Sequence, residues 1–278
     1  MKRNLTGYLL LILITFACQP HQETIRVKGS DTEVNLAVQL AETFYEQNND
    51  MFMSVSGGGS GLGIASLMNE TTDIANSSRS IKAKERALFE ERGIALDSFI
   101  FAQDAIAFIV SDDLPLDSIS SEQLAKILSG EYTNWSSITE KDLPISIYGR
   151  QSNSGTHGYI KKKLDIEFSQ YAKEMNGNGQ IMEGVKSDYS GIGYVGAGYV
   201  VHGGKEGIKV LPVYDATHPV AVSPLDADKI AEGKYLFQRP LFQYFKAESR
   251  EKVQPFLDFE KSEKGKQIIA DAGYYPVK

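Results

Sequence analysis

The chain has 278 residues, of which 42% are hydrophobic, so it is long enough and apolar enough to form two compact lobes. Its formal net charge is −7, and it has no basic stripe with interleaved aromatic residues, which argues against nucleic acid as a partner. The acidic balance also argues against broad electrostatic attachment to a membrane surface. Any anion that this chain binds must therefore be held by a few local groups.

The segment 1–17 has the pattern of a signal peptide. Lys2 and Arg3 supply a basic start, residues 9–14 form an apolar run too short to span a bilayer, and a small residue stands before Cys18. Cys18 is the only cysteine in the chain, so it has no disulfide partner and is available for acylation. This pattern resembles a bacterial lipoprotein signal. It predicts an exported protein with a lipid anchor on Cys18, attached to a bacterial membrane and facing the periplasm or the cell exterior; an ordinary cleaved signal peptide is the alternative.

From residue 24 onward, strand patterns alternate with helix patterns. Strands are predicted at 24–30, 51–56, 72–78, 104–111, 144–150, 189–196, 209–213 and 239–245. Helices are predicted at 32–48, 62–70, 82–93, 120–131, 155–164 and 253–273. Such alternation is typical of an α/β fold with mostly parallel strands flanked by helices.

Two of the predicted strands are long and strongly apolar, namely 104–111 and 239–245. One leaves the first part of the chain and the other returns to it, as a two-lobe protein with two hinge crossings requires. We therefore expect lobe one to contain residues 24–103 plus 225–278, and lobe two to contain residues 104–224.

Polar residues gather in four turns, each of which follows a predicted strand. The turns are KGSDT (28–32), GGGSG (57–61), NSSR (76–79) and GRQSNSGT (149–156). In open α/β sheets, ligands collect at the carboxyl ends of strands, where helix N-termini offer free N–H groups and a positive dipole end. Four converging turns of this kind would form a cradle for an anion.

The glycine-rich turn surrounds a single hydroxyl, that of Ser60. Glycines let the backbone approach a ligand closely and adopt positive φ, while the hydroxyl can donate one directional hydrogen bond. The turn carries neither the P-loop motif nor a strict G-x-G-x-x-G, so nucleotide binding lacks its usual fingerprint. A flexible turn is the alternative for this stretch taken alone.

Arg150 followed by Ser154, Gly155 and Thr156 is a more specific pattern. A guanidinium offers a planar fork for two oxygens of a tetrahedral anion, and the S-G-T turn adds hydroxyls and N–H donors at a helix start. The alternative is a surface ion pair for Arg150 with Ser154 as a helix N-cap.

These motifs, together with DAIAFIV (104–110), SSEQLAKILSGEYTNW (120–135) and SGIGYVG (190–196), resemble the phosphate-binding proteins of ABC phosphate transporters. That family belongs to the class II periplasmic-binding-protein superfamily, and the resemblance covers about residues 24–278. It implies an α/β fold of two lobes, each a mixed, mostly parallel sheet flanked by helices, with two hinge crossovers. It further implies a protein that binds inorganic phosphate between its lobes, performs no chemistry, needs no cofactor and meets the membrane subunits of an ABC permease. We expect a monomer.

The resemblance assigns the contacts to phosphate residue by residue. Ser60 corresponds to the hydroxyl donor of lobe one, and the residues from Arg150 to Thr156 correspond to a clamp in lobe two. The full expected set is Ser30, Asp31, Thr32, Ser60, Ser78, Arg79, Arg150, Ser154, Gly155 and Thr156.

One position departs from the family pattern. Well-known members carry an aspartate that accepts the proton of the phosphate, whereas this chain has Ser78 followed by Arg79. A serine can accept a hydrogen bond but carries no charge to repel a sulfate dianion. Asp31 is a candidate substitute acceptor, and capping of the following helix is its alternative role. The departure leaves open another tetrahedral oxyanion as ligand, or sensing in place of transport.

Two other functions can be weighed from the sequence. Ser154 and His157 could suggest a secreted serine hydrolase, but residues three apart seldom form a nucleophile and base, and no G-x-S-x-G elbow occurs. Four histidines, His21, His157, His202 and His218, are scattered without metal-ligand spacing, so no metal site is expected.

Overall fold

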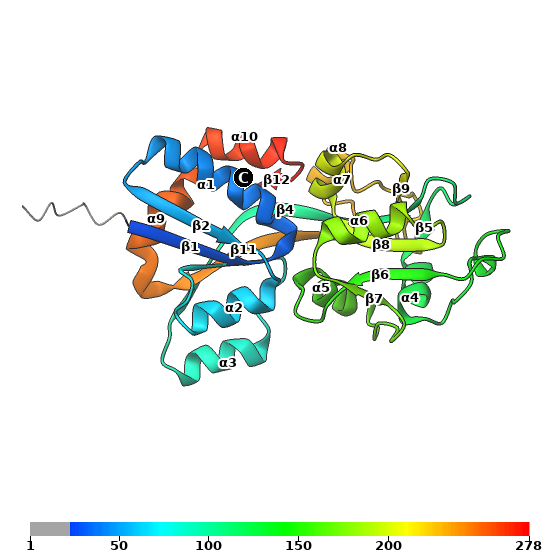
Figure 1. The fold of residues 1–278 in the computed structure, drawn as a ribbon, viewed down its shortest axis with the longest axis horizontal. Coiled ribbons are helices and arrows are strands. Elements are labelled where there is room, and N and C mark those ends of the chain that lie inside the picture. Colours follow the sequence, from blue (N-terminus) through cyan, green and yellow to red (C-terminus); the bar gives the residue numbers. More distant parts are fainter. Residues whose placement is uncertain (1–22, 278) are drawn as a thin grey trace, which may run out of the picture.

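The computed structural model describes residues 23–277, and the predicted signal peptide and Cys18 lie outside this range. The chain forms two lobes that lie side by side along the long axis of the molecule (Figure 1). Segments from both ends of the chain, blue to cyan and orange to red, build one lobe, and the green and yellow middle builds the other. The strands β4 and β11 run from one lobe into the other.

The first lobe begins with alternating strands and helices. They are β1 (Glu23–Gly29), the short 3-10 turn η1 (Asp31–Glu33), α1 (Val34–Gln47), β2 (Met51–Ser56), α2 (Ser60–Met68), β3 (Ile74–Ser77), α3 (Ala83–Glu91) and the long β4 (Leu96–Ser111). The helix α1 is amphipathic, because Leu36, Leu40 and Phe44 recur at every fourth position and are buried.

The second lobe follows, and the chain then returns to the first. The second lobe contains β5 (Ile119–Ser120), α4 (Ser121–Ser129), η2 (Trp135–Ser137), β6 (Ser146–Arg150), α5 (Gly155–Leu164), β7 (Lys173–Met175), α6 (Asn178–Lys186), β8 (Gly191–Gly196), α7 (Ala197–Gly203), β9 (Ile208–Leu211), β10 (Val213–Tyr214) and α8 (Ala227–Ala231). The returning elements are β11 (Gln238–Lys246), η3 (Ala247–Ser249), α9 (Arg250–Lys261), α10 (Glu263–Asp271) and β12 (Tyr275–Pro276).

One sheet runs through both lobes in the strand order β2-β1-β3-β11-β4-β8-β6-β7. The outer pairs β1–β2, β1–β3, β6–β7 and β6–β8 are parallel, whereas β11 and β4 pair antiparallel with their neighbours. Residues 96–105 of β4 pair with β11, and residues 106–110 pair with β8. The expected fold class is confirmed: an α/β fold of two lobes with a mixed sheet and two crossing strands.

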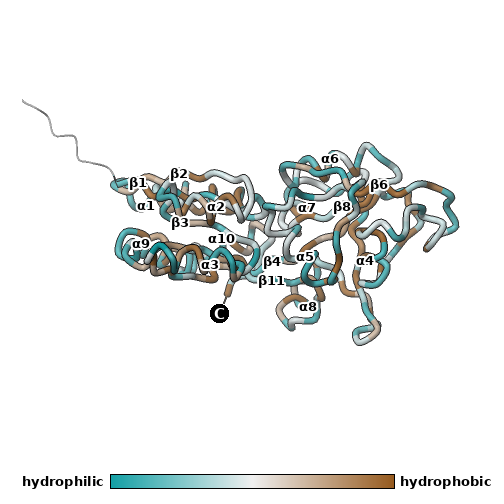
Figure 2. The backbone as a smooth tube through the Cα atoms, turned by 90° about the horizontal axis from the view of Figure 1, so that it is seen from below, coloured by the Kyte–Doolittle hydropathy of each residue, from teal (hydrophilic) through white to brown (hydrophobic). Residues whose placement is uncertain are grey.

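The buried hydrophobic residues of the described range form four clusters, two in each lobe. In the second lobe, Phe108, Trp135 and Tyr194 are buried together with Tyr235 and Phe237. These last two residues precede β11 and pack in the core of the second lobe. Figure 2 shows the two lobes again, with flanking helices whose coils alternate between hydrophilic and hydrophobic residues.

Some helices differ from their predicted extents. The helix expected at 253–273 is divided into α9 and α10, because Ser262 is extended and its hydroxyl accepts the N–H of Gly265 at 3.1 Å. The helices α6, α7 and α8 were not predicted; α7 and α8 have only seven and five residues, whereas α6 is as long as α4. Between residues 23 and 277, none of the helices has the length and apolar character needed to cross a membrane.

Phe108→Ala should destabilise the protein by about 3–5 kcal/mol, the usual cost of removing a buried aromatic ring from a packed core. The Phe108 side chain is fully buried and meets the Phe237 ring edge to face at a centroid distance of 4.9 Å. Urea denaturation would measure the loss, with Tyr171→Ala as a control because Tyr171 is 82% exposed. Equal midpoints for Phe108→Ala and the control would contradict the packing described.

Candidate anion-binding site

Three serine hydroxyls from different turns of the first lobe lie close together. Ser30 follows β1, Ser60 begins α2, and Ser78 follows β3. The Oγ atoms of Ser30 and Ser78 are 2.9 Å apart, and the backbone N–H of Ser78 donates to Ser60 Oγ at 3.1 Å. Since β1 and β3 are parallel neighbours, their carboxyl ends place these turns at the same edge of the sheet. All three hydroxyls are buried.

The N-terminus of α5, from the second lobe, lies against this serine cluster. Ser154 is the N-cap of α5, and its Oγ accepts the backbone N–H of His157 at 3.4 Å. Gly155 lies so close to Ser60 and Ser78 that a Cβ atom there would collide with both hydroxyls. Only glycine permits this approach, which sets the free N–H groups of a helix start beside three hydroxyls.

Arg239, at the start of β11, connects the two lobes beneath the cluster. Its Nε and Nη2 donate to Asp104 Oδ2 at 2.9 and 2.7 Å, and both side chains are at most 1% exposed. The same Nη2 lies 3.2 Å from Thr32 Oγ1 and 3.0 Å from Thr156 Oγ1, and Nη1 donates to the Ser78 carbonyl. The sequence analysis placed Arg239 in an apolar strand and gave it no role in the site. The presence of a charged residue in that strand is the feature that could have identified it.

Arg150 is buried at the end of β6 and forms an ion pair with Asp31 of the first lobe. Its Nη1 donates to Asp31 Oδ2 at 3.2 Å, and Nη2 donates to the Asn176 carbonyl at 2.9 Å. Burial lowers the pKa of Arg150, and the negative charge of Asp31 opposes this shift. The Nε atom of Arg150 is buried and makes no hydrogen bond within residues 23–277.

Asp31 also lies at the start of α6. The backbone N–H and the Nδ2 of Asn178 both donate to Asp31 Oδ2 at 2.9 Å. A carboxylate beside a helix N-terminus is favourable, because it meets free N–H groups and the positive dipole end. Asp31 therefore stabilises a helix of the opposite lobe, and the N-cap positions of its own turn and of α1 are held by Ser30 and Glu33. Asn178 was not predicted, although it lies in the stretch NGNG (176–179), whose Asn-Gly pairs are a turn signal.

Arg79 is directed away from the serine cluster. Its Nη1 and Nη2 donate to the two carboxylate oxygens of Glu85 at 2.8 and 2.6 Å, and Nη1 also donates to the Ser80 carbonyl. The structure thus brings nine of the ten expected residues to the seam between the lobes and leaves Arg79 in a local ion pair at its edge.

The two lobes contact each other directly along this seam. The N–H of Gly61 donates to the Asn153 carbonyl at 3.0 Å, and Asn153 Nδ2 donates to the Gly58 carbonyl at 3.2 Å. The hydroxyls of Thr32 and Thr156 are 3.0 Å apart. Of these residues, Thr32 and Thr156 belong to the expected anion-binding set, so their mutual contact occupies two hydroxyls that the sequence assigned to an anion.

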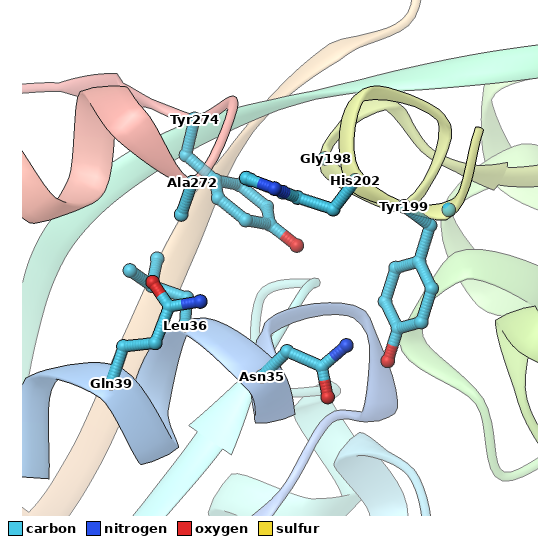
Figure 3. A pocket seen from close by; sticks show the side chains of 9 residues that line it. Asn35, Leu36, Gln39, Gly198, Tyr199, His202, Ala272 and Tyr274 are labelled. Atoms are coloured by element: carbon cyan, nitrogen blue, oxygen red, sulfur yellow. The ribbon is translucent and has the colours of Figure 1, made fainter. Parts of the chain in front are cut away.

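Two hollows open beside the seam. A groove of about 920 Å³ lies along α5 and the segment 79–83, and its lining includes Lys82, Lys161, Lys162 and Lys163 with Asp165 and Glu167. A smaller pocket of about 290 Å³ lies between α1 and α7 (Figure 3), where Asn35, Gln39, Tyr199 and His202 surround it. The groove gathers positive charge on an acidic protein, whereas the pocket is lined mainly by neutral groups.

The geometry does not support a catalytic pair of Ser154 and His157. The Ser154 hydroxyl caps α5, while the His157 ring stacks on Phe168 and its Nδ1 lies 3.0 Å from the Arg150 carbonyl. Burial lowers the pKa of His157. Across the described part of the chain, no three His, Cys, Asp or Glu side chains are grouped to hold a metal ion.

Two α/β lobes joined by two crossing strands, with polar groups and helix N-termini along their seam, define a solute-binding protein of the periplasmic type. The model of the PBP superfamily domain matches residues 16–264. Phosphate-binding protein PstS of Borreliella burgdorferi is 28% identical over 283 residues, covering 98% of this chain and 97% of that protein. Phosphate-binding protein PstS of Bacillus subtilis is 30% identical over 261 residues, with coverages of 91% and 81%. The chain belongs to the PBP superfamily and, within it, to the PstS family.

A solved structure supports the same fold. The substrate-binding protein of a phosphate ABC transporter from Clostridium perfringens, determined with bound phosphate, superposes with a TM-score of 0.81 at 24% identity. The match covers 92% of this chain and 100% of that one. The arrangement of the lobes is therefore that of a known binding protein.

Asp104→Asn should destabilise the protein by about 3–5 kcal/mol, because it leaves the buried Arg239 charge without its partner. Thermal or urea denaturation would measure the change. Asp117→Asn is the matched control, since Asp117 pairs with Lys209 at the surface and is 97% exposed; it should change stability by less than about 1 kcal/mol. If the two substitutions changed the stability by similar amounts, groups other than Asp104 would be compensating the charge of Arg239.

Proposed function

We propose that this protein is an extracytoplasmic binding lipoprotein that captures inorganic phosphate between its lobes and delivers it to an ABC importer. The observation that carries the proposal is the convergence, on one seam, of three hydroxyls from the first lobe with Arg150 and the start of α5 from the second. Membership of the PstS family supports phosphate as the ligand. In this role the protein is not an enzyme.

Each group has a distinct part in holding a tetrahedral anion. Arg150 supplies the positive charge, and its buried Nε has no hydrogen-bond partner among residues 23–277. Ser60, with Gly155 and Thr156, supplies hydroxyl and N–H donors from both lobes. Because these donors belong to different lobes, an anion bound to all of them favours the closed arrangement, and its release requires the lobes to separate.

Ser78 favours a second candidate ligand, another tetrahedral oxyanion. It is buried beside Ser30 and Ser60 and brings no negative charge that would repel a sulfate dianion. The Asp31 carboxylate, a possible substitute, has one oxygen already engaged with Arg150 and Asn178. Isothermal titration of the purified chain with phosphate, sulfate, arsenate and molybdate would rank the ligands. The proposal requires saturable phosphate binding, and binding of sulfate or molybdate alone would favour the second candidate.

Arg150→Ala should weaken phosphate binding by roughly two to four decades, the effect of about 3–5 kcal/mol when one partner of a desolvated charge pair is removed. The same titration measures it. Arg250→Ala is the control, since Arg250 is half-exposed and lies on α9, away from the seam; it should bind like the wild type. If Arg150→Ala bound phosphate as tightly as the control, Arg150 would not be part of the phosphate-binding clamp.

Cys18→Ser should release the protein from membranes without unfolding it, because the proposed anchor is a lipid on residue 18 and the described fold begins at residue 23. A single acyl chain anchors only marginally, so more than one chain is expected. Membrane fractionation with circular dichroism of the released chain would test this. Continued sedimentation of the variant with membranes would rule out lipid attachment at Cys18.

A further inference from the structure

Asp31 belongs to the first lobe, but the bonds of its side chain reach the second. Its Oδ2 atom accepts from Arg150 Nη1 at 3.2 Å and from the backbone N–H and Nδ2 of Asn178 at 2.9 Å. The Tyr199 hydroxyl donates to the Asp31 carbonyl at 2.8 Å, and Figure 3 shows this tyrosine projecting from α7. These three partners lie on β6, α6 and α7, so three elements of the second lobe converge on one residue of the first.

The Asp31 carboxylate is enclosed by groups of both lobes. The Asp31 side chain is 19% exposed, and that of Arg150 is 1% exposed. A Cβ atom on Gly177, just before α6, would lie 3.1 Å from Asp31 Oδ2, which is closer than side-chain carbons normally approach. A Cβ atom on Gly57, in the turn after β2, would lie 3.5 Å from Oδ1. Water has little access to this ion pair, so the attraction between its charges is only weakly screened.

The other direct contacts along the seam are of a weaker kind. They join neutral backbone, amide and hydroxyl groups, as between Thr32 and Thr156. Within residues 23–277, Asp31 and Arg150 form the one ion pair that joins the lobes away from the crossing strands. A hydrogen bond with an ionised partner is roughly twice as strong as one between neutral groups. Asp31 is therefore expected to contribute more than the other seam residues to holding the lobes together.

We propose that Asp31 is a latch that holds the two lobes closed through the chain's own bonds. Its carboxylate acts as an internal counter-ion for Arg150, and its bonds to Asn178 and Tyr199 tie α6 and α7 to the first lobe. Separation of the lobes at this seam breaks these bonds together, because the partners lie on opposite sides of it. Loss of the latch therefore shifts the molecule towards an open arrangement, whether or not an anion is present.

The latch deepens the proposed function and rests on it only for the identity of the ligand. An anion enters between the lobes while they are apart, so a latch that favours the closed arrangement lowers the fraction of the protein that can take it up. Once inside, the anion adds its own bonds to both lobes and favours closure further. Asp31 is thus a positioning residue, which controls access to the site and acts on the anion through Arg150.

The test measures the distance between the lobes by pulsed electron paramagnetic resonance. The reference chain carries spin labels at two exposed positions, Glu263→Cys on α10 and Tyr171→Cys in the second lobe, and Cys18→Ser so that no other cysteine is labelled. Without phosphate, it should give mainly the distance between these two positions in the closed structure. Adding Asp31→Ala should lower the ratio of closed to open populations by about tenfold or more, the effect of losing a hydrogen bond to a charged partner.

Two further variants make the result specific. Asp73→Asn is the matched control, because Asp73 is also a largely buried, ion-paired aspartate of the first lobe, but its partners Arg26 and Lys252 belong to the same lobe; it should keep the reference distances. Tyr199→Phe removes only the hydroxyl that donates to the Asp31 carbonyl. It should lower the closed-to-open ratio by about twofold to tenfold, the effect of one neutral hydrogen bond, and it decides the matter if Asp31→Ala does not fold.

The possible failures are distinguishable. The latch is overturned if Asp31→Ala, or Tyr199→Phe where only that variant folds, keeps the reference distances without phosphate. It is also overturned if the reference chain is mainly open without phosphate, or if Asp73→Asn shifts the closed-to-open ratio as far as Asp31→Ala does. If the distances change as expected but titration of the wild type detects no phosphate binding, the proposed function is wrong while the role of Asp31 stands.

Discussion

The ion pair between Arg239 and Asp104 is the constraint on which the rest of the site depends. The two residues are cross-strand partners on β11 and β4, at the place where both strands pass between the lobes. Burying two charges is expensive unless they are paired and their remaining hydrogen-bonding groups are satisfied. Arg239 meets this condition by donating to Thr32 and Thr156 and to the carbonyl of Ser78. The pair therefore fixes a threonine from each lobe, and one serine turn, relative to the crossing strands.

A second ion pair acts across the lobes at a different position. Arg150 belongs to the second lobe and Asp31 to the first. Asp31 also accepts two hydrogen bonds from Asn178, so one carboxylate oxygen joins a turn of one lobe to a helix start of the other. Arg239 and Asp104 both lie on the crossing strands, whereas Arg150 and Asp31 belong to different lobes. One buried ion pair is therefore formed within the crossing strands and the other across the seam.

The sequence predicted which turns form the candidate site, but it did not predict which charged side chains pair with each other there. The turns that carry Ser30, Ser60 and Ser78 meet because parallel strands end at one edge, a consequence that follows from the alternation of strands and helices. The sequence offered Ser154 as a helix cap, but for Arg150 it left open an anion clamp or a surface ion pair, and only the structure shows that this arginine is buried. Arg79 was grouped with them because of its place in the same motif, but its nearest acid, six residues later, holds it elsewhere.

The sequence alone determined the α/β class, the amphipathic helices, the polar turns and the family, because periodicity, glycine content and capping residues act over a few neighbouring positions. The tertiary structure decided which charges meet. Arg239 and Asp104 are 135 residues apart in sequence, and Arg150 and Asp31 are 119 apart. It also decided that Glu33, which the sequence presents as an ordinary acid near a helix start, is fully buried. Local patterns cannot specify such partners, since burial and pairing depend on how distant segments pack together.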